Sequence, residues 1–120
     1  FLQALKEHKK EGGTAGRLKR YNNNCKIICD GMKKLGFKQL LSDELQAPII
    51  ITFMQPNHAN FIFEKFYNKL SERGFLIYPG KLTVANTFRI GCIGDLNSND
   101  MYATLEAIKE TIKELNINLN

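Results

Sequence analysis

Apolar residues recur at every third or fourth position along two long segments, and this spacing limits the folds that the chain can adopt. The first segment begins after Thr14, which has the position of an N-cap, and ends at Gly36; the second begins near Ser98. Each is predicted to be a helix with a single apolar face, which must be buried against a shared core. The faces are formed by Leu18, Tyr21, Cys25, Ile28, Met32 and Leu35 in the first helix and by Met101, Leu105, Ile108, Ile112 and Leu115 in the second.

Shorter segments supply the rest of the predicted fold. Residues 1–11 read as the end of another helix, stopped by Gly12 and Gly13, and residues 58–73 as a further helix that ends at Gly74. Stretches rich in β-branched and aromatic residues predict strands at 37–41, 48–54, 75–78 and 87–93. Three or four strands, mostly antiparallel and covered on one face by amphipathic helices, make an α+β fold.

The last predicted strand has a lone arginine, Arg89, in its interior. Side chains alternate between the two faces of a strand. One face therefore receives Phe88, Ile90 and Cys92, and the other receives Thr87, Arg89, Gly91 and Ile93. The first set suits the core beneath the helices, so Arg89 is expected to point away from that core. Gly91, on the same face, leaves room for another group to approach the guanidinium.

Two interpretations of Arg89 are compatible with its spacing. It is either a solvated or ion-paired strand cation, or the partner of an anion that the forked guanidinium can hold by two parallel hydrogen bonds. No other residue competes strongly as a chemical site. His8 and His58 have no partner at catalytic spacing, and no Cys or His pair has the spacing of a zinc site.

Size, charge and cysteine content narrow the class of protein. The 120 residues fit one domain, and the net charge of +5 comes from dispersed basic residues, so no nucleic-acid partner is expected. Cys25 and Cys29 lie four apart on one predicted helix, where a disulfide fits poorly, which favours reduced thiols and a cytoplasmic location. No apolar run reaches membrane-spanning length. The chain begins at Phe1 within a helix-like run, so we expect a segment of a longer protein.

Four motifs occur in one order and at fitting distances along the chain. They are EGGTAGRLKRY at 11–21, LQAPIIITF at 45–53, GFLIYPGK at 74–81 and FRIGCIG at 88–94. Together they resemble the C-terminal part of the class V aminotransferases, which share the pyridoxal-phosphate architecture called fold type I. The combination of the first and third motifs is similar to the branch of that family that uses 2-aminoethylphosphonate and pyruvate.

The resemblance implies a domain plan and a role for Arg89. Residues 1–13 would be the end of an interdomain helix and residues 14–120 a C-terminal small domain, with the large cofactor-binding domain outside this chain. Arg89 would bind the acidic group of the substrate, a phosphonate in one half-reaction and a carboxylate in the other. The implied reaction moves an amino group from 2-aminoethylphosphonate to pyruvate and gives phosphonoacetaldehyde and alanine.

The resemblance also implies that this segment is inactive by itself. In the family, the large domain binds pyridoxal 5'-phosphate and supplies the Schiff-base lysine, and no residue here corresponds to that lysine. Lys81 follows a turn and does not match it. The expected partners are the chain's own large domain, the small-molecule substrates and, at full length, a second copy in a homodimer.

Two alternatives remain open. The parent could be another class V enzyme, of the alanine–glyoxylate type, which would use Arg89 for carboxylates only. The chain could instead be a non-enzymatic, basic α+β interaction module. Such a module would bind nucleic acid through Lys9, Lys10, Arg17, Lys19 and Arg20.

Overall fold

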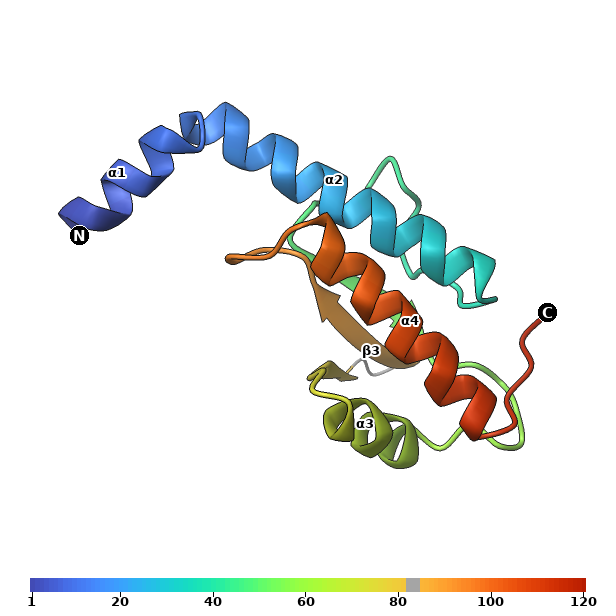
Figure 1. Ribbon diagram of the computed structural model, residues 1–120. Helices are drawn as coiled ribbons and strands as arrows, with labels where there is room; N and C mark the ends of the chain where they lie inside the picture. The colour runs from blue at the N-terminus through green and yellow to red at the C-terminus, as the bar shows by residue number, and fades with distance from the viewer. Residues whose placement is uncertain (82–84) are drawn as a thin grey trace.

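The computed structural model describes residues 1–81 and 85–120 and has the expected α+β architecture (Figure 1). The described residues form one antiparallel sheet of three strands and four helices, which confirms the predicted fold class. The elements are α1 (Leu2–Lys10), α2 (Gly13–Lys34), β1 (Ile50–Met54), α3 (Phe63–Glu72), β2 (Tyr78–Lys81), β3 (Asn86–Gly91) and α4 (Ser98–Glu114).

The three strands form one antiparallel sheet in the order β1-β3-β2, so β3 is the central strand. In β3, Phe88 pairs with Phe53 of β1, and the next residue, Arg89, pairs with Thr52. On the other side, Arg89 pairs with Tyr78 of β2. The central strand therefore has a ladder of backbone hydrogen bonds along both edges, which fixes the register of every side chain that it carries.

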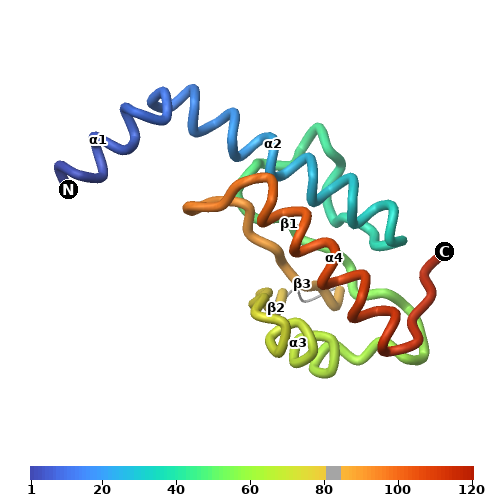
Figure 2. Tube along the Cα trace, viewed as in Figure 1, coloured from blue at the N-terminus to red at the C-terminus, as the bar shows by residue number. Residues whose placement is uncertain are grey.

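Helices cover one face of this sheet. Helix α4 lies across the sheet and packs against both α2 and α3 (Figures 1 and 2). Helix α1 and the start of α2 extend beyond the body of the molecule, and α1 has no buried residue. Within the described part of the chain, we find no helix that is both long and apolar enough to span a bilayer.

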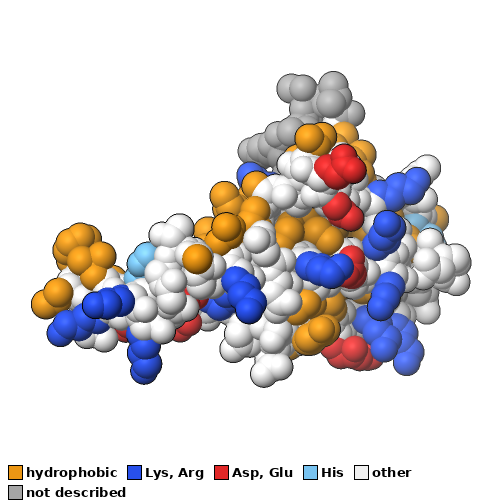
Figure 3. Space-filling view, turned by 90° about the horizontal axis from the view of Figure 1, so that it is seen from above, with side chains coloured by type: hydrophobic (Ala, Val, Ile, Leu, Met, Phe, Trp, Pro, Cys, Tyr) orange, Lys and Arg blue, Asp and Glu red, His pale blue; other side chains and the backbone are white. Residues whose placement is uncertain are grey.

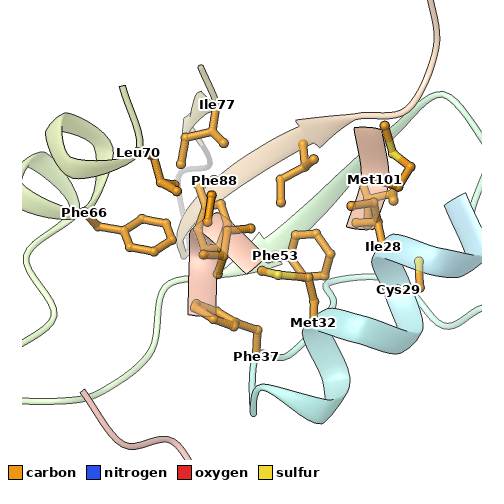
Figure 4. Close-up of a cluster of buried hydrophobic side chains, with 14 of the residues drawn as sticks. Ile28, Cys29, Met32, Phe37, Phe53, Phe66, Leu70, Ile77, Phe88 and Met101 are labelled. Carbon is orange, nitrogen blue, oxygen red and sulfur yellow. The ribbon is translucent and has the colours of Figure 1, made fainter. Parts of the chain in front are cut away.

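Phe88 lies at the centre of the core between the sheet and the helices (Figure 4). Its side chain is fully buried, and its ring centroid lies 5.7 Å from that of Phe53 on β1 and 5.6 Å from that of Phe66 on α3. Phe37, which follows α2, meets the same ring edge-on at 5.7 Å. Aromatic pairs at these separations add to the stabilisation that comes from burial alone. Phe88 thus joins the sheet to two of its covering segments.

Several element boundaries differ from the sequence prediction. Thr14 is not the N-cap of α2; the cap is Gly12, whose φ of 104° only a glycine adopts readily, and the helix begins one residue before Thr14. Gly36 does end the helix as predicted, with a φ of 94°. Helix α4 begins at Ser98 as predicted and is capped by a reciprocal pair between Asn97 and Asp100.

Two predicted strands and one helix start are displaced. The stretch 37–41 forms a single bridge, between Gln39 and Phe53, and no strand. The strand expected at 75–78 begins only at Tyr78, because the backbone N–H of Phe75 donates to the carbonyl of Leu70 and completes the end of α3. Residues 58–62 are not helical and include a turn at 59–60, so α3 starts five residues later than predicted. The predicted loop between the last two strands includes residues 82–84, which lie outside the described residues.

The apolar face predicted for α2 is longer than the part of that helix that is buried in the core. Cys25, Ile28 and Met32 of α2 are buried as predicted. Leu18, which the apolar spacing placed on the buried face, is instead 49% exposed. The reason is geometric for Leu18, because the first half of α2 extends past the edge of the sheet and has no core beneath it (Figure 1).

Polar side chains of α2 hold the segment that follows β3. The guanidinium of Arg20 donates to the backbone carbonyls of Gly94 and Leu96. Asn24 is fully buried, and its amide donates to the carbonyls of Cys92, at 3.2 Å, and Leu96, at 3.0 Å. These bonds connect residues about 70 positions apart. They fix the end of the central strand against the helix layer and give the first sequence motif a structural role.

Glu11 orients this network. One carboxylate oxygen accepts from Arg20 and the other accepts from Arg17 at 2.9 Å. The hydrogen bonds from Arg20 and then Arg17 hold the pKa of Glu11 below its usual value. Two of the five basic residues considered for nucleic-acid binding are therefore already paired within the chain.

We expect Phe88→Ala to lower the free energy of unfolding by about 3–5 kcal/mol, because it removes the ring that the aromatic cluster shares. Urea denaturation monitored by far-ultraviolet circular dichroism measures this change. Phe1→Ala is the matched control: this ring is 98% exposed, and its loss should change stability by less than about 0.5 kcal/mol. A loss below about 1 kcal/mol for Phe88→Ala would contradict the central role of this side chain.

The ion pairs of Glu11 predict a specific dependence of stability on pH. A carboxyl whose pKa is lowered in the folded state stabilises the fold above its unfolded pKa of about 4.3, and this stabilisation is lost as the pH falls through the lower folded value. Glu11→Gln should therefore lower the melting temperature at pH 7, and the difference from the parent chain should shrink in acid. Glu44→Gln, in an exposed turn, is the control. A difference that is independent of pH would mean that Glu11 does not act through its charge.

Candidate anion-binding site

Arg89 lies in the middle of the central strand, on the face of the sheet opposite the core. Phe88 and Ile90, its neighbours in sequence, are buried at 0% and 5% exposure, whereas Arg89 itself is exposed. The predicted alternation is confirmed for these residues. Cys92 is also buried, as predicted for the core face. A strand arginine is thus held at a fixed position on the open side of the sheet.

The position of Thr87 differs from the prediction. It shares the face of Arg89, yet it is fully buried. The cause is the close approach of β2, because a Cβ atom added to Gly80 would lie only 2.1 Å from the Thr87 hydroxyl oxygen. The backbone of Gly80 therefore covers this side chain. Gly91 behaves as predicted: a Cβ atom there would have no neighbour within 4 Å, so the space beside Arg89 is open.

A depression of about 480 Å³ surrounds the Arg89 side chain. Its walls come from all three strands and from the segment before β1. The lining residues are Leu40, Thr52, Tyr78, Pro79, Gly80, Thr87 and Arg89. Among them Arg89 is the one charged residue, and the rest are apolar or carry a hydroxyl. A small anion that enters this depression meets a positive charge, and none of the described lining residues opposes it with a carboxylate.

Among the described residues, Arg89 has one hydrogen-bond partner, so most of its donors are available to a ligand. One Nη atom donates to the backbone carbonyl of Pro79 at 3.3 Å, a long hydrogen bond. A guanidinium has five N–H donors in all. Among the ion pairs between described residues, none involves Arg89. The Pro79 contact holds the guanidinium near β2 without neutralising it.

The structure adds two residues to the site that the sequence interpretation did not identify. Thr52 and Tyr78 lie directly opposite Arg89 on the two flanking strands. Directly opposite residues of antiparallel strands share a face, so the three side chains form a row across the sheet. The pairing of β1 with β3 joins segments more than thirty positions apart, and no local signal in the sequence specifies which residue faces Arg89.

The remaining candidates do not form a second site. His58 accepts a hydrogen bond from the backbone N–H of Asn60 at 3.1 Å, and His8 lies on the projecting helix α1. Within residues 1–81 and 85–120, no group of three or more His, Cys, Asp or Glu side chains has the arrangement of a metal site. Cys25 and Cys29 are free thiols with their sulfur atoms 3.9 Å apart. The contact with Cys25, together with burial, raises the pKa of the Cys29 thiol above its usual value.

Curated sequences similar to this chain are transaminases. The chain is 51% identical over 117 residues to a 2-aminoethylphosphonate–pyruvate transaminase of Rhizobium meliloti (strain 1021). The aligned region covers 98% of the chain and 30% of that protein. The chain is also 43% identical over 115 residues to the transaminase of the same name from Pseudomonas putida (strain GB-1), covering 96% of the chain and 31% of the relative. The chain thus spans less than a third of the length of these relatives. No family model matches it.

Solved structures with a similar fold include two aminotransferases. Ureidoglycine–glyoxylate aminotransferase from Bacillus subtilis superposes with a TM-score of 0.86 at 17% identity, covering 98% of this chain and 30% of that one. An aspartate aminotransferase from Thermus thermophilus gives a TM-score of 0.67 at 17% identity, covering 95% and 29%. Identities this low establish the fold alone. Sequence and fold together confirm the resemblance predicted from the motifs: over nearly its whole length, the chain is similar to about 30% of a 2-aminoethylphosphonate–pyruvate transaminase, and it has the aminotransferase fold.

Proposed function

We propose that this chain is the C-terminal small domain of a transaminase that moves an amino group from 2-aminoethylphosphonate to pyruvate, giving phosphonoacetaldehyde and alanine. In this proposal residues 14–120 form the small domain, and residues 1–13 end a helix that leads to a large domain. The observation that carries the proposal is the guanidinium of Arg89, which forms no ion pair with another described residue, in a depression whose other described lining residues are uncharged. The sequence similarity supports the choice of substrates.

Arg89 binds the acidic group of each substrate in turn. A guanidinium donates two parallel hydrogen bonds to a phosphonate or to a carboxylate, so one side chain serves both half-reactions. Each charge-assisted hydrogen bond contributes about 1.5–3 kcal/mol. The fixed register of β3 keeps the guanidinium in place while the substrates exchange, and the open space beside Gly91 leaves room for their approach.

Pyridoxal 5'-phosphate, the cofactor implied by the family, does not fit the described residues of this chain by themselves. Its chemistry needs a lysine amine for the Schiff base and an acidic partner for the pyridine nitrogen. Among the described residues, those that line the Arg89 depression offer neither a lysine amine nor a carboxylate. In the proposal, both groups come from the large domain, and this chain contributes the binding of the substrate's acidic end.

The projecting helix α1 supports a partner domain beside this one. Phe1 and Leu2 are 98% and 65% exposed, and Leu5 is 49% exposed. Figure 3 shows apolar and basic side chains on the arm that extends from the body of the molecule. A nine-residue helix with no buried contact is too short to be stable in water alone, so it needs a surface to pack on. We assign that surface to the large domain, and the full-length protein to a homodimer.

A second candidate is a transaminase of the alanine–glyoxylate type. The aminotransferase with the TM-score of 0.86 takes glyoxylate by its name, and Arg89 can hold a carboxylate as well as a phosphonate. The two candidates differ in the amino donor. Conversion of 2-aminoethylphosphonate by the full-length enzyme favours the first, and conversion of amino acids alone favours the second.

We expect Arg89→Lys in the full-length enzyme to raise KM about 10- to 100-fold for both acidic substrates, because lysine cannot form the forked pair of bonds. The cofactor absorbance should remain unchanged. Steady-state kinetics and the visible spectrum measure the two effects. Arg73→Lys, at a side chain paired with Glu114 on the helix layer, is the matched control and should leave KM unchanged. Unchanged kinetics for Arg89→Lys would refute the assignment.

The isolated 120-residue chain should show no transaminase activity when pyridoxal 5'-phosphate is added, because none of the described residues that line the depression beside Arg89 carries an amine for the Schiff base. A coupled assay for alanine formation from pyruvate and 2-aminoethylphosphonate tests this expectation, with the full-length enzyme as the positive control. Turnover by the isolated chain above the rate with cofactor alone would show that it contains a complete active site.

A further inference from the structure

The residues on either side of Arg89, Thr52 and Tyr78, are placed to influence which anion the site prefers. These residues pair directly across the three strands and line the same depression. Directly opposite Cβ atoms in antiparallel strands lie about 4.5–5.5 Å apart. A ligand atom held by the Arg89 guanidinium is therefore flanked by a hydroxyl-bearing side chain on either side. Tyr78 is 56% exposed and Thr52 is half-buried, so both are accessible from the depression.

The two substrate head groups differ in the number of oxygen atoms that accept hydrogen bonds. A carboxylate has two oxygens in one plane, and the planar guanidinium fork satisfies both. A phosphonate has three oxygens at the corners of a tetrahedron, so the fork engages two and leaves the third out of its plane. In a partly desolvated site, a charged oxygen without a donor is costly. Recognition of a phosphonate thus calls for a donor beside the guanidinium as well as the guanidinium itself.

The hydroxyls of Tyr78 and Thr52 are available for that role. Within the described part of the chain, neither takes part in a side-chain hydrogen bond, whereas the hydroxyls of Thr104 and Thr111 donate to backbone carbonyls at 2.8 and 2.7 Å. Thr87 lines the same depression, but Gly80 covers its hydroxyl, which has no partner. The two accessible hydroxyls of the site are thus the ones that flank Arg89.

We propose that Tyr78, assisted by Thr52, determines specificity for a phosphonate over a carboxylate by donating a hydrogen bond to the third oxygen held at Arg89. This proposal rests on the proposed function and deepens it. The phenol of Tyr78 is the principal donor, because this side chain is the longer and the more exposed of the two. The shorter hydroxyl of Thr52 contributes from the opposite strand. A carboxylate bound to Arg89 makes no such bond.

Tyr78→Phe in the full-length enzyme tests the proposal, since it removes one hydroxyl from an exposed ring. Stopped-flow measurement of the cofactor absorbance follows each half-reaction alone, with 2-aminoethylphosphonate or L-alanine as the amino donor. We expect the apparent second-order rate constant for the phosphonate donor to fall about tenfold or more, and that for alanine to change less than about twofold. Thr52→Val should change the same two constants in the same direction, to a smaller extent.

Equilibrium binding provides a readout that does not depend on turnover. Calorimetric titration with methylphosphonate and with acetate compares a three-oxygen and a two-oxygen head group on the same methyl group. Tyr78→Phe should weaken methylphosphonate about tenfold and leave acetate unchanged. The matched control is Tyr102→Phe, at a tyrosine that is 60% exposed on α4 and lines no part of the depression.

The outcomes separate this proposal from the proposed function. If Arg89→Lys weakens both anions and Tyr78→Phe and Thr52→Val weaken neither, Arg89 binds substrate but the hydroxyls do not select it, and this proposal is overturned. Equal weakening of methylphosphonate and acetate by Tyr78→Phe would also overturn it, because the residue would then support Arg89 in general. If Arg89→Lys weakens neither anion, the proposed function itself fails.

Discussion

The two faces of the central strand β3 carry the core and the candidate site, and the rest of the structure depends on how Phe88 is buried. Its ring is the common contact of the aromatic cluster, which includes rings from β1, α3 and the segment after α2. Because side chains alternate along a strand, the burial of Phe88 places its neighbour Arg89 on the opposite face of the sheet. The energy that fixes the position of Arg89 therefore comes from apolar packing on the far side of the same strand, together with ladders on both edges.

A second constraint acts at the end of this strand. Buried Asn24 and the guanidinium of Arg20 bind backbone carbonyls between Cys92 and Leu96, and Glu11 orients Arg20 from the neighbouring turn. Buried or half-buried polar groups of this kind are costly unless they are paired, so they specify one arrangement strongly. The motif at 11–21 thus acts on the strand that bears Arg89 even though it makes no contact with the depression around it.

Local patterns in the sequence were sufficient for much of the fold. The period of apolar residues predicted a helix that begins near Ser98, where α4 starts, and Gly36 marked the end of α2, because caps and periodicity are local properties. Predictions from local patterns were wrong where a contact or the edge of the sheet, neither visible in the local sequence, decided the structure. Phe75 lies in a β-rich stretch but bonds back to α3, and Leu18 continues the apolar stripe of α2 past the edge of the sheet. Asn24, a polar residue within that stripe, was the local sign of the network that the interpretation missed.

The sequence by itself determined that Arg89 would stand on the solvent side of a strand, because alternation along a strand is fixed by backbone geometry. Its motifs also indicated the transaminase resemblance that the comparisons confirm. Only the tertiary structure decided which residues surround the arginine. Strand order and register bring Thr52 and Tyr78 to its two sides, and the close approach of Gly80 buries Thr87. Register depends on packing between segments far apart in the chain, so no local pattern specifies it.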